Sequence, residues 1–162
     1  MSVELFRIDD RLIHGQVVVG WGQPLEIGFI VLVDDQVAAN DWEQDLYRMG
    51  VPDDMALYFE SVDRAVARLA DHLADERPGI VLTGDTATMR RLAEGSGRVE
   101  RVNVGGVHHR PGRVEHLRYV FLTPSEVADL QAMAAGGIDV TAQDLPSADP
   151  VSLASLLANA SP

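Results

Sequence analysis

Residues 7–17, RIDDRLIHGQV, bring together side chains that suit the transfer of a phosphoryl group. His14 can act as a nucleophile, because imidazole is largely neutral at pH 7 and forms covalent intermediates through a ring nitrogen. Arg11 can neutralise phosphoryl oxygens with a two-pronged contact, and Asp9 or Asp10 can orient the imidazole or the guanidinium. A simpler interpretation is also open, in which the histidine is structural and the aspartates only serve a turn.

The pattern around His14 places it where a strand passes into a helix. Residues 3–8 predict a short strand, and residues 15–22 predict a short helix. A helix start offers unpaired backbone N–H groups and the positive end of the helix dipole, which together hold a phosphate group. Gly15 has no side chain to block that approach. His14 is therefore expected beside a phosphate site.

A second, glycine-rich segment, residues 102–113 (VNVGGVHHRPGR), follows another predicted strand. Gly105 and Gly106 permit a close approach to the His14 loop, and Arg110 or Arg113 can add positive charge there. The alternative is an ordinary glycine-rich turn. Taken with the first segment, this gives the residues that we expect to bind phosphate: Gly15, Gln16, Asp10 and Arg110.

The remaining histidines do not predict a metal site. His108 and His109 are adjacent, so on an extended chain they point to opposite faces, and no carboxylate cluster completes a ligand set. His72, on a predicted helix, and His116, at a predicted strand start, are expected at the surface. The common nucleotide-binding loops GxxxxGK[ST] and GxGxxG do not occur. We therefore expect neither a metal nor another bound cofactor.

Composition narrows the class of protein. The 162 residues suit one domain, and the net charge of −12 argues against nucleic acid as a partner, because phosphate neutralisation needs a basic surface. Apolar runs are far shorter than the roughly 20 residues of a membrane span, and the N-terminus does not resemble a signal peptide. Cysteine is absent, so disulfides and thiolate chemistry are excluded. These features predict a cytoplasmic protein.

Strands and helices are predicted to alternate along the whole chain. The expected strands are residues 3–8, 28–35, 55–61, 79–85, 99–106, 116–122 and 138–146. The expected helices are residues 15–22, 41–50, 62–76, 86–95, 123–137 and 149–160. Asn40, Thr86 and Thr123 are the expected N-caps, the last in a capping box with Glu126. Such alternation predicts a single α/β domain over 1–162, with an open, mostly parallel sheet and helices on both faces.

The first segment strongly resembles the active-site segment of the IIB subunits of bacterial sugar phosphotransferase systems, in the mannose/fructose/sorbose family. Three more segments resemble that family in the correct order: IVLVDDQVAAND (30–41), VNVGGVHHRPGR (102–113) and LTPSEVADLQAMAAGGIDVTAQDLP (122–146). The resemblance therefore covers nearly the whole chain, and its first segment is the most specific.

The resemblance implies an open, largely parallel α/β sheet and a transient phosphohistidine. It implies that His14 receives a phosphoryl group from a phosphohistidine of a IIA partner and passes it to a sugar carried by the membrane subunits IIC and IID. It also implies that Arg11 helps to hold the phosphoryl group and that Asp9 supports the site. The donor is already activated, so no metal or nucleotide is implied, and a homodimer is plausible.

Two other functions are open at this point. One is a regulatory phosphohistidine relay that is not coupled to sugar transport, and the other is a non-catalytic α/β ligand-binding domain with a structural His14. The chain also differs from the family at Val19 and Gly20, where members often carry polar or basic side chains. This difference removes contacts that could serve phosphate or a partner, and the sugar itself is not identified by the sequence.

Overall fold

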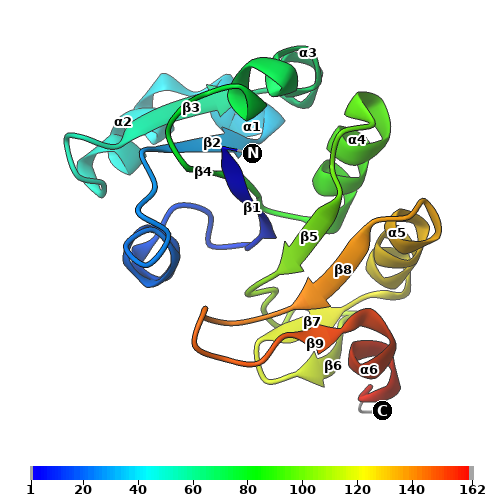
Figure 1. Cartoon of the computed structure of the whole chain (residues 1–162). Helices are drawn as coiled ribbons and strands as arrows, with labels where there is room; N and C mark the ends of the chain where they lie inside the picture. The colour runs from blue at the N-terminus through cyan, green and yellow to red at the C-terminus, as the bar shows by residue number, and fades with distance from the viewer. Residues whose placement is uncertain (1, 161–162) are drawn as a thin grey trace.

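The structure, a computed structural model, describes residues 2–160 and contains one seven-stranded twisted sheet (Figure 1). From edge to edge the strands are β3 (Ala56–Glu60), β2 (Phe29–Val33), β4 (Gly79–Thr83), β1 (Val3–Ile8), β5 (Arg101–Val104), β8 (Asp139–Ala142) and β9 (Val151–Ser152). All neighbours pair in parallel except β8 and β9, which are antiparallel. The predicted open, mostly parallel sheet is therefore confirmed.

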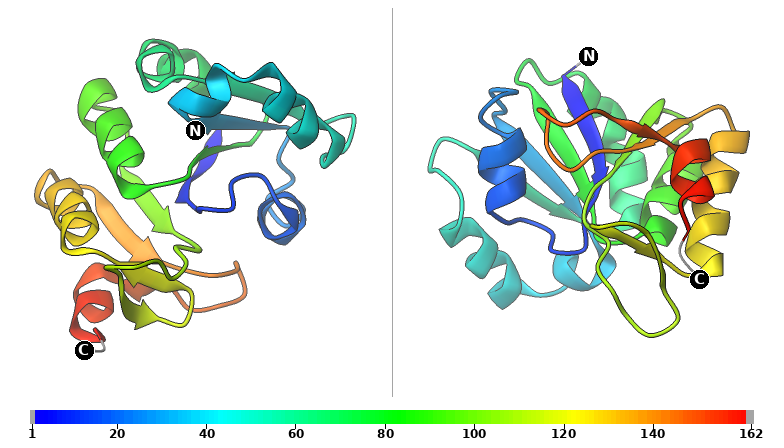
Figure 2. Two further views of the ribbon diagram at one scale, coloured as in Figure 1. Left: turned by 180° about the vertical axis from the view of Figure 1, so that it is seen from behind. Right: turned by 90° about the horizontal axis from the view of Figure 1, so that it is seen from below.

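Helices cover the two faces of this sheet unequally (Figure 2). The helices are α1 (Asp35–Ala38), α2 (Asp41–Met49), α3 (Val62–Leu73), α4 (Thr86–Ser96), α5 (Pro124–Ala135), α6 (Leu153–Ala158) and a short π-helix, η1 (Gln16–Trp21). One apolar core joins one face to α3, α4, α5 and α6. A second, smaller core joins the other face to η1, α1 and α2, mainly over β2 and β4.

Alternation along the central strands explains the two cores. In β2, Phe29, Val31 and Val33 belong to the first core, whereas Ile30 and Leu32 belong to the second. Successive side chains of a strand point to opposite faces, so a strand covered on both faces is a continuous apolar run. Full burial of one such side chain stabilises the fold by roughly 1.5–3 kcal/mol.

Most predicted helix starts are confirmed. Asn40 caps α2, and Thr123 forms a capping box with Glu126 at α5. The prediction for Thr86 is wrong, because Asp85 caps α4 and its Oδ1 accepts a hydrogen bond from Thr88 N at 2.7 Å. Thr86 is instead buried in the first turn, where its hydroxyl donates to Asp129.

The C-terminal third differs most from the predicted elements. Residues 116–122, predicted as one strand, fold back as an antiparallel hairpin of β6 (Val114–Leu117) and β7 (Val120–Leu122). The predicted terminal helix is preceded by β9 and begins only at Leu153. Local periodicity cannot distinguish one strand from two short strands joined by a two-residue turn.

The surface positions predicted for His72 and His116 are also wrong, since both side chains are buried. The Nε2 atom of His72 lies 3.0 Å from a carboxylate oxygen of buried Glu60. The Nδ1 atom of His116 lies 3.2 Å from the carbonyl oxygen of Leu156. Both histidines were predicted at the surface because they are polar, but a polar side chain can be buried when it has a hydrogen-bond partner. Here each partner lies on another helix or strand, so the local sequence did not indicate it.

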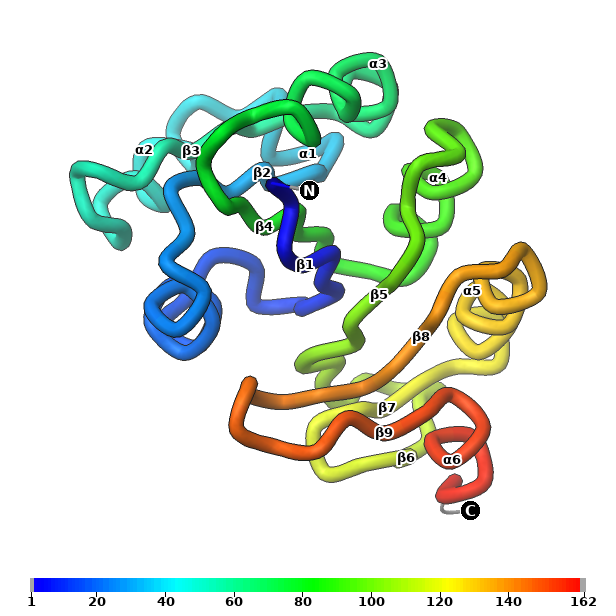
Figure 3. Tube along the Cα trace, in the orientation of Figure 1, coloured from blue at the N-terminus to red at the C-terminus, as the bar shows by residue number. Residues whose placement is uncertain are grey.

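The carboxyl ends of β1, β4 and β5 lie side by side and carry the loops of interest. The chain leaves β1 as a loop that leads into η1, and the β8–β9 connection, residues 143–150, extends toward η1 from the other side (Figure 3). Within residues 2–160, no helix has the length and apolar character needed to cross a membrane.

Candidate functional site

Backbone hydrogen bonds fix the loop after β1 to its neighbours. The N–H of Asp9 donates to the carbonyl of Thr83 at the end of β4, and the N–H of Asp10 donates to Gly106 beyond β5, at 2.9 and 2.8 Å. Leu12 then adopts a left-handed conformation with φ of +60°, which costs about 1–3 kcal/mol for a residue with a side chain. The turn is therefore strained and is held by the sheet on both sides.

His14 lies against Asp9 at the end of this turn. The Nε2 atom of His14 is 3.1 Å from Oδ1 of Asp9, whose side chain is fully buried. Nε2 is itself buried, although the contact is not aligned as a hydrogen bond. The imidazole as a whole is 17% exposed, so the accessible ring nitrogen is Nδ1. The arrangement presents one nitrogen to solvent and sets the other against a carboxylate.

Asp9 is surrounded by groups that favour its ionised form. Burial alone raises the pKa of Asp9, but His14, the guanidinium of Arg7 and the backbone N–H of Arg11 together outweigh that effect, so the pKa lies below its usual value. Besides His14, the contacts are 3.2 Å from Arg7 Nη2 to Oδ2 and 3.2 Å from Arg11 N to Oδ1. Gly106 N also approaches Oδ2, at 3.4 Å. Asp9 is thus held as a buried anion.

Arg7 is a fully buried arginine that the sequence did not single out. Its Nη1 donates to Oδ1 of Asn103 and to the carbonyl of Gln143, at 2.5 and 2.9 Å. Its Nη2 donates to Asp9 and to the carbonyl of Asp144, and its Nε is buried without an acceptor within the described range. Burial lowers the pKa of Arg7, an effect that Asp9 opposes. The guanidinium joins the His14 loop to β5 and to the β8–β9 connection.

Two further residues border that guanidinium: Trp21 covers it, and Gly105 leaves space for it. The indole of Trp21 lies over it, with 5.2 Å from Arg7 Cζ to the ring centroid. A side chain at Gly105 would collide with the guanidinium itself, so the first glycine of the predicted close approach is needed for Arg7 rather than for His14. The signal in the sequence was an arginine between the apolar residues Phe6 and Ile8 of a predicted strand.

Arg11 stands at the open side of the site. Its side chain is half exposed, and its Nη2 donates to Oε1 of Gln16 at 2.9 Å. Gln16 in turn donates from Nε2 to Oδ1 of Asp144 at 2.7 Å. The structure therefore brings Arg11 and Gln16 together within the loop, and it adds Asp144, which the sequence did not suggest.

Backbone donors are free beside His14. The N–H groups of Val17 and Val18 both donate to the carbonyl of His14, at 3.0 and 2.9 Å. Within residues 2–160, by contrast, the N–H groups of His14, Gly15 and Gln16 donate to no protein acceptor. Gly15 is exposed, and a methyl group built at its Cα would meet nothing within 4 Å. These N–H groups are available to an anion.

Asp10, expected to bind phosphate, has a different set of contacts. Its carboxylate lies 2.6 Å from Nδ1 of His108 and accepts from the backbone N–H of His108 at 2.8 Å. Arg113 is 3.6 Å away from it and is bound mainly to Glu126, at 2.7 Å. These contacts hold the loop after β5 against the His14 loop.

Arg110 is exposed in the same loop. Only its backbone is engaged, because its carbonyl accepts from Arg113 N at 3.0 Å, and its side chain has no ion pair or hydrogen bond within the described part of the chain. No contact links Arg110 to His14 there.

Val19 and Gly20, where the sequence differs from the family pattern, have different surroundings. Val19 is 51% exposed on η1. Gly20 faces the β8–β9 connection, and a Cβ atom there would lie 2.7 Å from Cδ2 of Leu145. Gly20 therefore allows η1 to pack closely against that connection.

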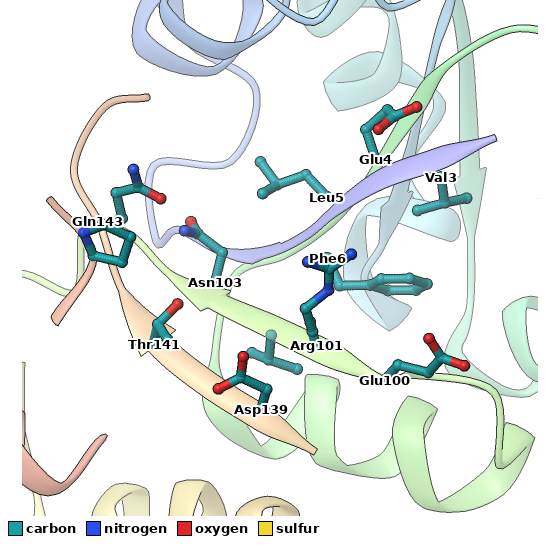
Figure 4. A pocket seen from close by; sticks show the side chains of 12 residues that line it. Val3, Glu4, Leu5, Phe6, Glu100, Arg101, Asn103, Asp139, Thr141 and Gln143 are labelled. Carbon is teal, nitrogen blue, oxygen red and sulfur yellow. The ribbon is translucent and has the colours of Figure 1, made fainter. Parts of the chain in front are cut away.

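His14 does not line the cavity on the neighbouring sheet face. A cavity of about 260 Å³ lies on the sheet face formed by β1, β5 and β8, where Leu5, Asn103 and Thr141 line it, and His14 is not part of it (Figure 4). Residues 2–160 contain no group of three or more His, Cys, Asp or Glu side chains placed to hold a metal ion. The histidine stands on an open edge, as an exchange between proteins would need.

Comparisons with known proteins find one family of related chains. A family model described as "PTS system sorbose subfamily IIB component" matches residues 3–161. The chain is 29% identical over 157 residues to the N-acetylgalactosamine-specific phosphotransferase enzyme IIB component 2 of Escherichia coli (strain K12), covering 96% of this chain and 99% of the relative. It is 32% identical over 158 residues to a probable phosphotransferase enzyme IIB component of Streptococcus pyogenes, covering 93% and 96%. A crystal structure of the N-acetylgalactosamine-specific IIB component 1 from Escherichia coli superposes with a TM-score of 0.84, at 28% identity over 93% of this chain and 98% of that one.

Proposed function

Because the chain belongs to the sorbose-subfamily IIB components of the phosphotransferase system, we propose that it carries a phosphoryl group on His14 during sugar uptake. The single observation that supports His14 most directly is the arrangement of its ring, with Nε2 3.1 Å from the buried carboxylate of Asp9 and Nδ1 facing solvent. Nδ1 is then the acceptor atom.

The transfer needs no proton to move. Asp9 favours the tautomer with the proton on Nε2, which leaves the lone pair on Nδ1. That lone pair attacks the phosphorus of a phosphohistidine on the IIA partner and a new P–N bond forms, while the P–N bond of the donor breaks and its electron pair returns to the donor imidazole. The ionised Asp9 stabilises the ring as it gains positive character.

The neighbouring donors then hold the phosphoryl oxygens. The half-exposed guanidinium of Arg11 supplies positive charge, and the free N–H groups of Gly15 and Gln16 supply hydrogen bonds. Arg11 must exchange its contact with the Gln16 side chain for the phosphoryl group. Asp10 has no part in this binding, because its carboxylate is engaged by His108.

The second transfer defines the activity as that of a protein-Nπ-phosphohistidine–sugar phosphotransferase. A hydroxyl oxygen of a sugar held by the membrane subunits IIC and IID forms an O–P bond while the bond from Nδ1 to phosphorus breaks, its electron pair returns to the imidazole and the hydroxyl proton is released; this step calls for no metal or nucleotide. The chain therefore works at the cytoplasmic face of the membrane, in contact first with phosphorylated IIA and then with IIC and IID.

Intact-mass measurement tests this proposal. The protein is incubated with phosphoenolpyruvate, the general phosphotransferase proteins and a cognate IIA protein. We expect an acid-labile gain of one phosphoryl group, which His14→Ala abolishes and the matched control His109→Ala retains. No gain on the wild-type chain would refute the role of carrier. Sugar phosphorylation reconstituted with IIC and IID then distinguishes transport from a purely regulatory relay.

A further inference from the structure

Helix α2 presents its apolar side chains to solvent. Trp42, Leu46 and Met49 recur at positions i, i+4 and i+7, which lie on one face of a helix, and they are 71%, 47% and 82% exposed. No residue of α2 is buried, and Tyr47 forms its inner contact by stacking on Phe59 with ring centroids 6.3 Å apart. A surface helix normally turns its apolar stripe toward the core. The outward orientation here indicates that something else covers the stripe.

The stripe has the chemistry of a protein interface. Trp and Met are enriched in the buried centres of interfaces, and contiguous apolar patches with a polar rim mark interaction sites. Figure 2 shows α2 at the periphery of the molecule. A hollow of about 230 Å³ beyond its C-terminus, lined in part by Val51, Pro52 and Met55, can receive a partner side chain.

The charges around the stripe select among partners. Asp41, Glu43 and Asp45 lie on α2, and Asp53 lines the hollow beyond it. Arg48, the one basic residue of the helix, is paired with Asp45 at 3.0 Å. Helices that lie on membranes are rich in Lys and Arg because the cytoplasmic leaflet is anionic, so this acidic helix does not suit a lipid surface.

A second copy of the chain suits the stripe no better. Pairing two stripes would set one acidic rim against another in a protein of net charge −12, and like charges across an interface cost free energy. Arg64 and Arg68 line a groove along β3, to which Arg48 of α2 also contributes. Two of these three arginines are already paired, Arg48 with Asp45 at 3.0 Å and Arg68 with Glu60 at 3.2 Å, so the groove offers little free positive charge to the acidic rim of a second copy. The stripe therefore calls for a partner with an apolar groove and a basic rim.

We propose that the stripe of Trp42, Leu46 and Met49 docks on the cytoplasmic loops of the membrane subunits IIC and IID. The proposal rests on the proposed function. Cytoplasmic loops of membrane proteins carry an excess of Lys and Arg, which matches the acidic rim. IIA and the IIC–IID complex must contact His14 in turn. A separate attachment through α2 would keep the carrier on the membrane complex while IIA binds and leaves at His14.

The double variant Trp42→Ser, Met49→Ser tests the docking. Its side chains are mostly exposed, so the unfolding midpoint should stay near that of the wild type. Val114→Ser, at an exposed valine on β6, is the matched control. Affinity is measured for a purified IIC–IID pair in nanodiscs. We expect the stripe variant to bind at least about tenfold more weakly and the control to bind as the wild type. Phosphorylation of His14 by phospho-IIA should be unchanged in both.

Each other outcome overturns the proposal. Equal binding by the stripe variant removes the stripe from the interface. A fall in phosphorylation by phospho-IIA assigns the stripe to IIA, and conversion of a dimer to a monomer in light scattering assigns it to a second copy. Stripe-dependent binding to nanodiscs without IIC and IID assigns it to lipid. A wild-type chain that takes up no phosphoryl group refutes the proposed function instead, while the nanodisc measurement still reports on docking.

Discussion

Replacing Arg7 by methionine would remove the buried cation that supports Asp9. The guanidinium of Arg7 makes four hydrogen bonds, to Asn103, Asp9 and the carbonyls of Gln143 and Asp144. Removing one partner of a buried ion pair costs about 3–5 kcal/mol, because the other charge is left uncompensated. Methionine also removes the desolvation cost of the guanidinium, so we expect a loss near the lower end, about 3 kcal/mol of unfolding free energy.

The same change should slow phosphoryl transfer. Burial already raises the pKa of Asp9, and without Arg7 less opposes that effect, so the pKa rises and the carboxylate also loses the hydrogen bond that fixes its position. A carboxylate that Arg7 no longer holds in place orients the imidazole of His14 less firmly. An interaction with an ionised group is worth about 1.5–3 kcal/mol, which corresponds to a rate roughly ten to a hundred times lower.

Urea unfolding and single-turnover phosphorylation by phospho-IIA, followed by intact mass, measure the two effects. The matched control is Arg101→Met, which removes an exposed arginine from β5 and should change stability by less than about 0.5 kcal/mol. Arg7→Lys keeps a charge and should recover part of the rate. An Arg7→Met protein within about 1 kcal/mol of the wild type, with an unchanged rate, would refute the role assigned to Arg7.

Three further predictions concern single contacts. Because the pKa of Asp9 lies below the usual 3.8, its ionised form adds stability that is present above that pH and is lost as the pH falls through the lower, folded-state value. Asp9→Asn should therefore flatten stability against pH below about pH 4 in chemical unfolding, and an unchanged curve would contradict the assignment. Gly20→Ala should change the free energy of unfolding by less than about 1 kcal/mol, because the new Cβ meets at 2.7 Å only Cδ2 of Leu145, the tip of a half-buried side chain that can turn away, and alanine favours a helix over glycine; a loss above about 2 kcal/mol in thermal unfolding would mean that Leu145 cannot move. Asp10→Ala should speed hydrogen exchange at the amide of His108, which donates to Asp10 at 2.8 Å, and unchanged protection would show that another contact holds that loop.

The sequence predicted those features that depend on neighbouring residues. The apolar run of β2 and the alternation of elements predicted a parallel sheet with its loops at one edge, and Thr123 with Glu126 predicted the start of α5. Asp9 and His14 were assigned to one loop because they are close in the chain, and the structure sets their side chains 3.1 Å apart. The predicted cap at Thr86 failed because Asp85, one residue earlier, makes the stronger capping contact.

Only the tertiary structure assigned a role to Arg7. Strand alternation places Arg7 on the face opposite Phe6 and Ile8, but it does not show what lies there. The acceptor in Asn103 is 96 residues away, and the carbonyl of Gln143 is 136 residues away. The buried positions of His72 and His116 were missed for the same reason. A short motif therefore predicted where the phosphoryl chemistry would take place, whereas contacts between distant strands decided which buried charge lies beside it, because burial and the choice of partner depend on the whole fold.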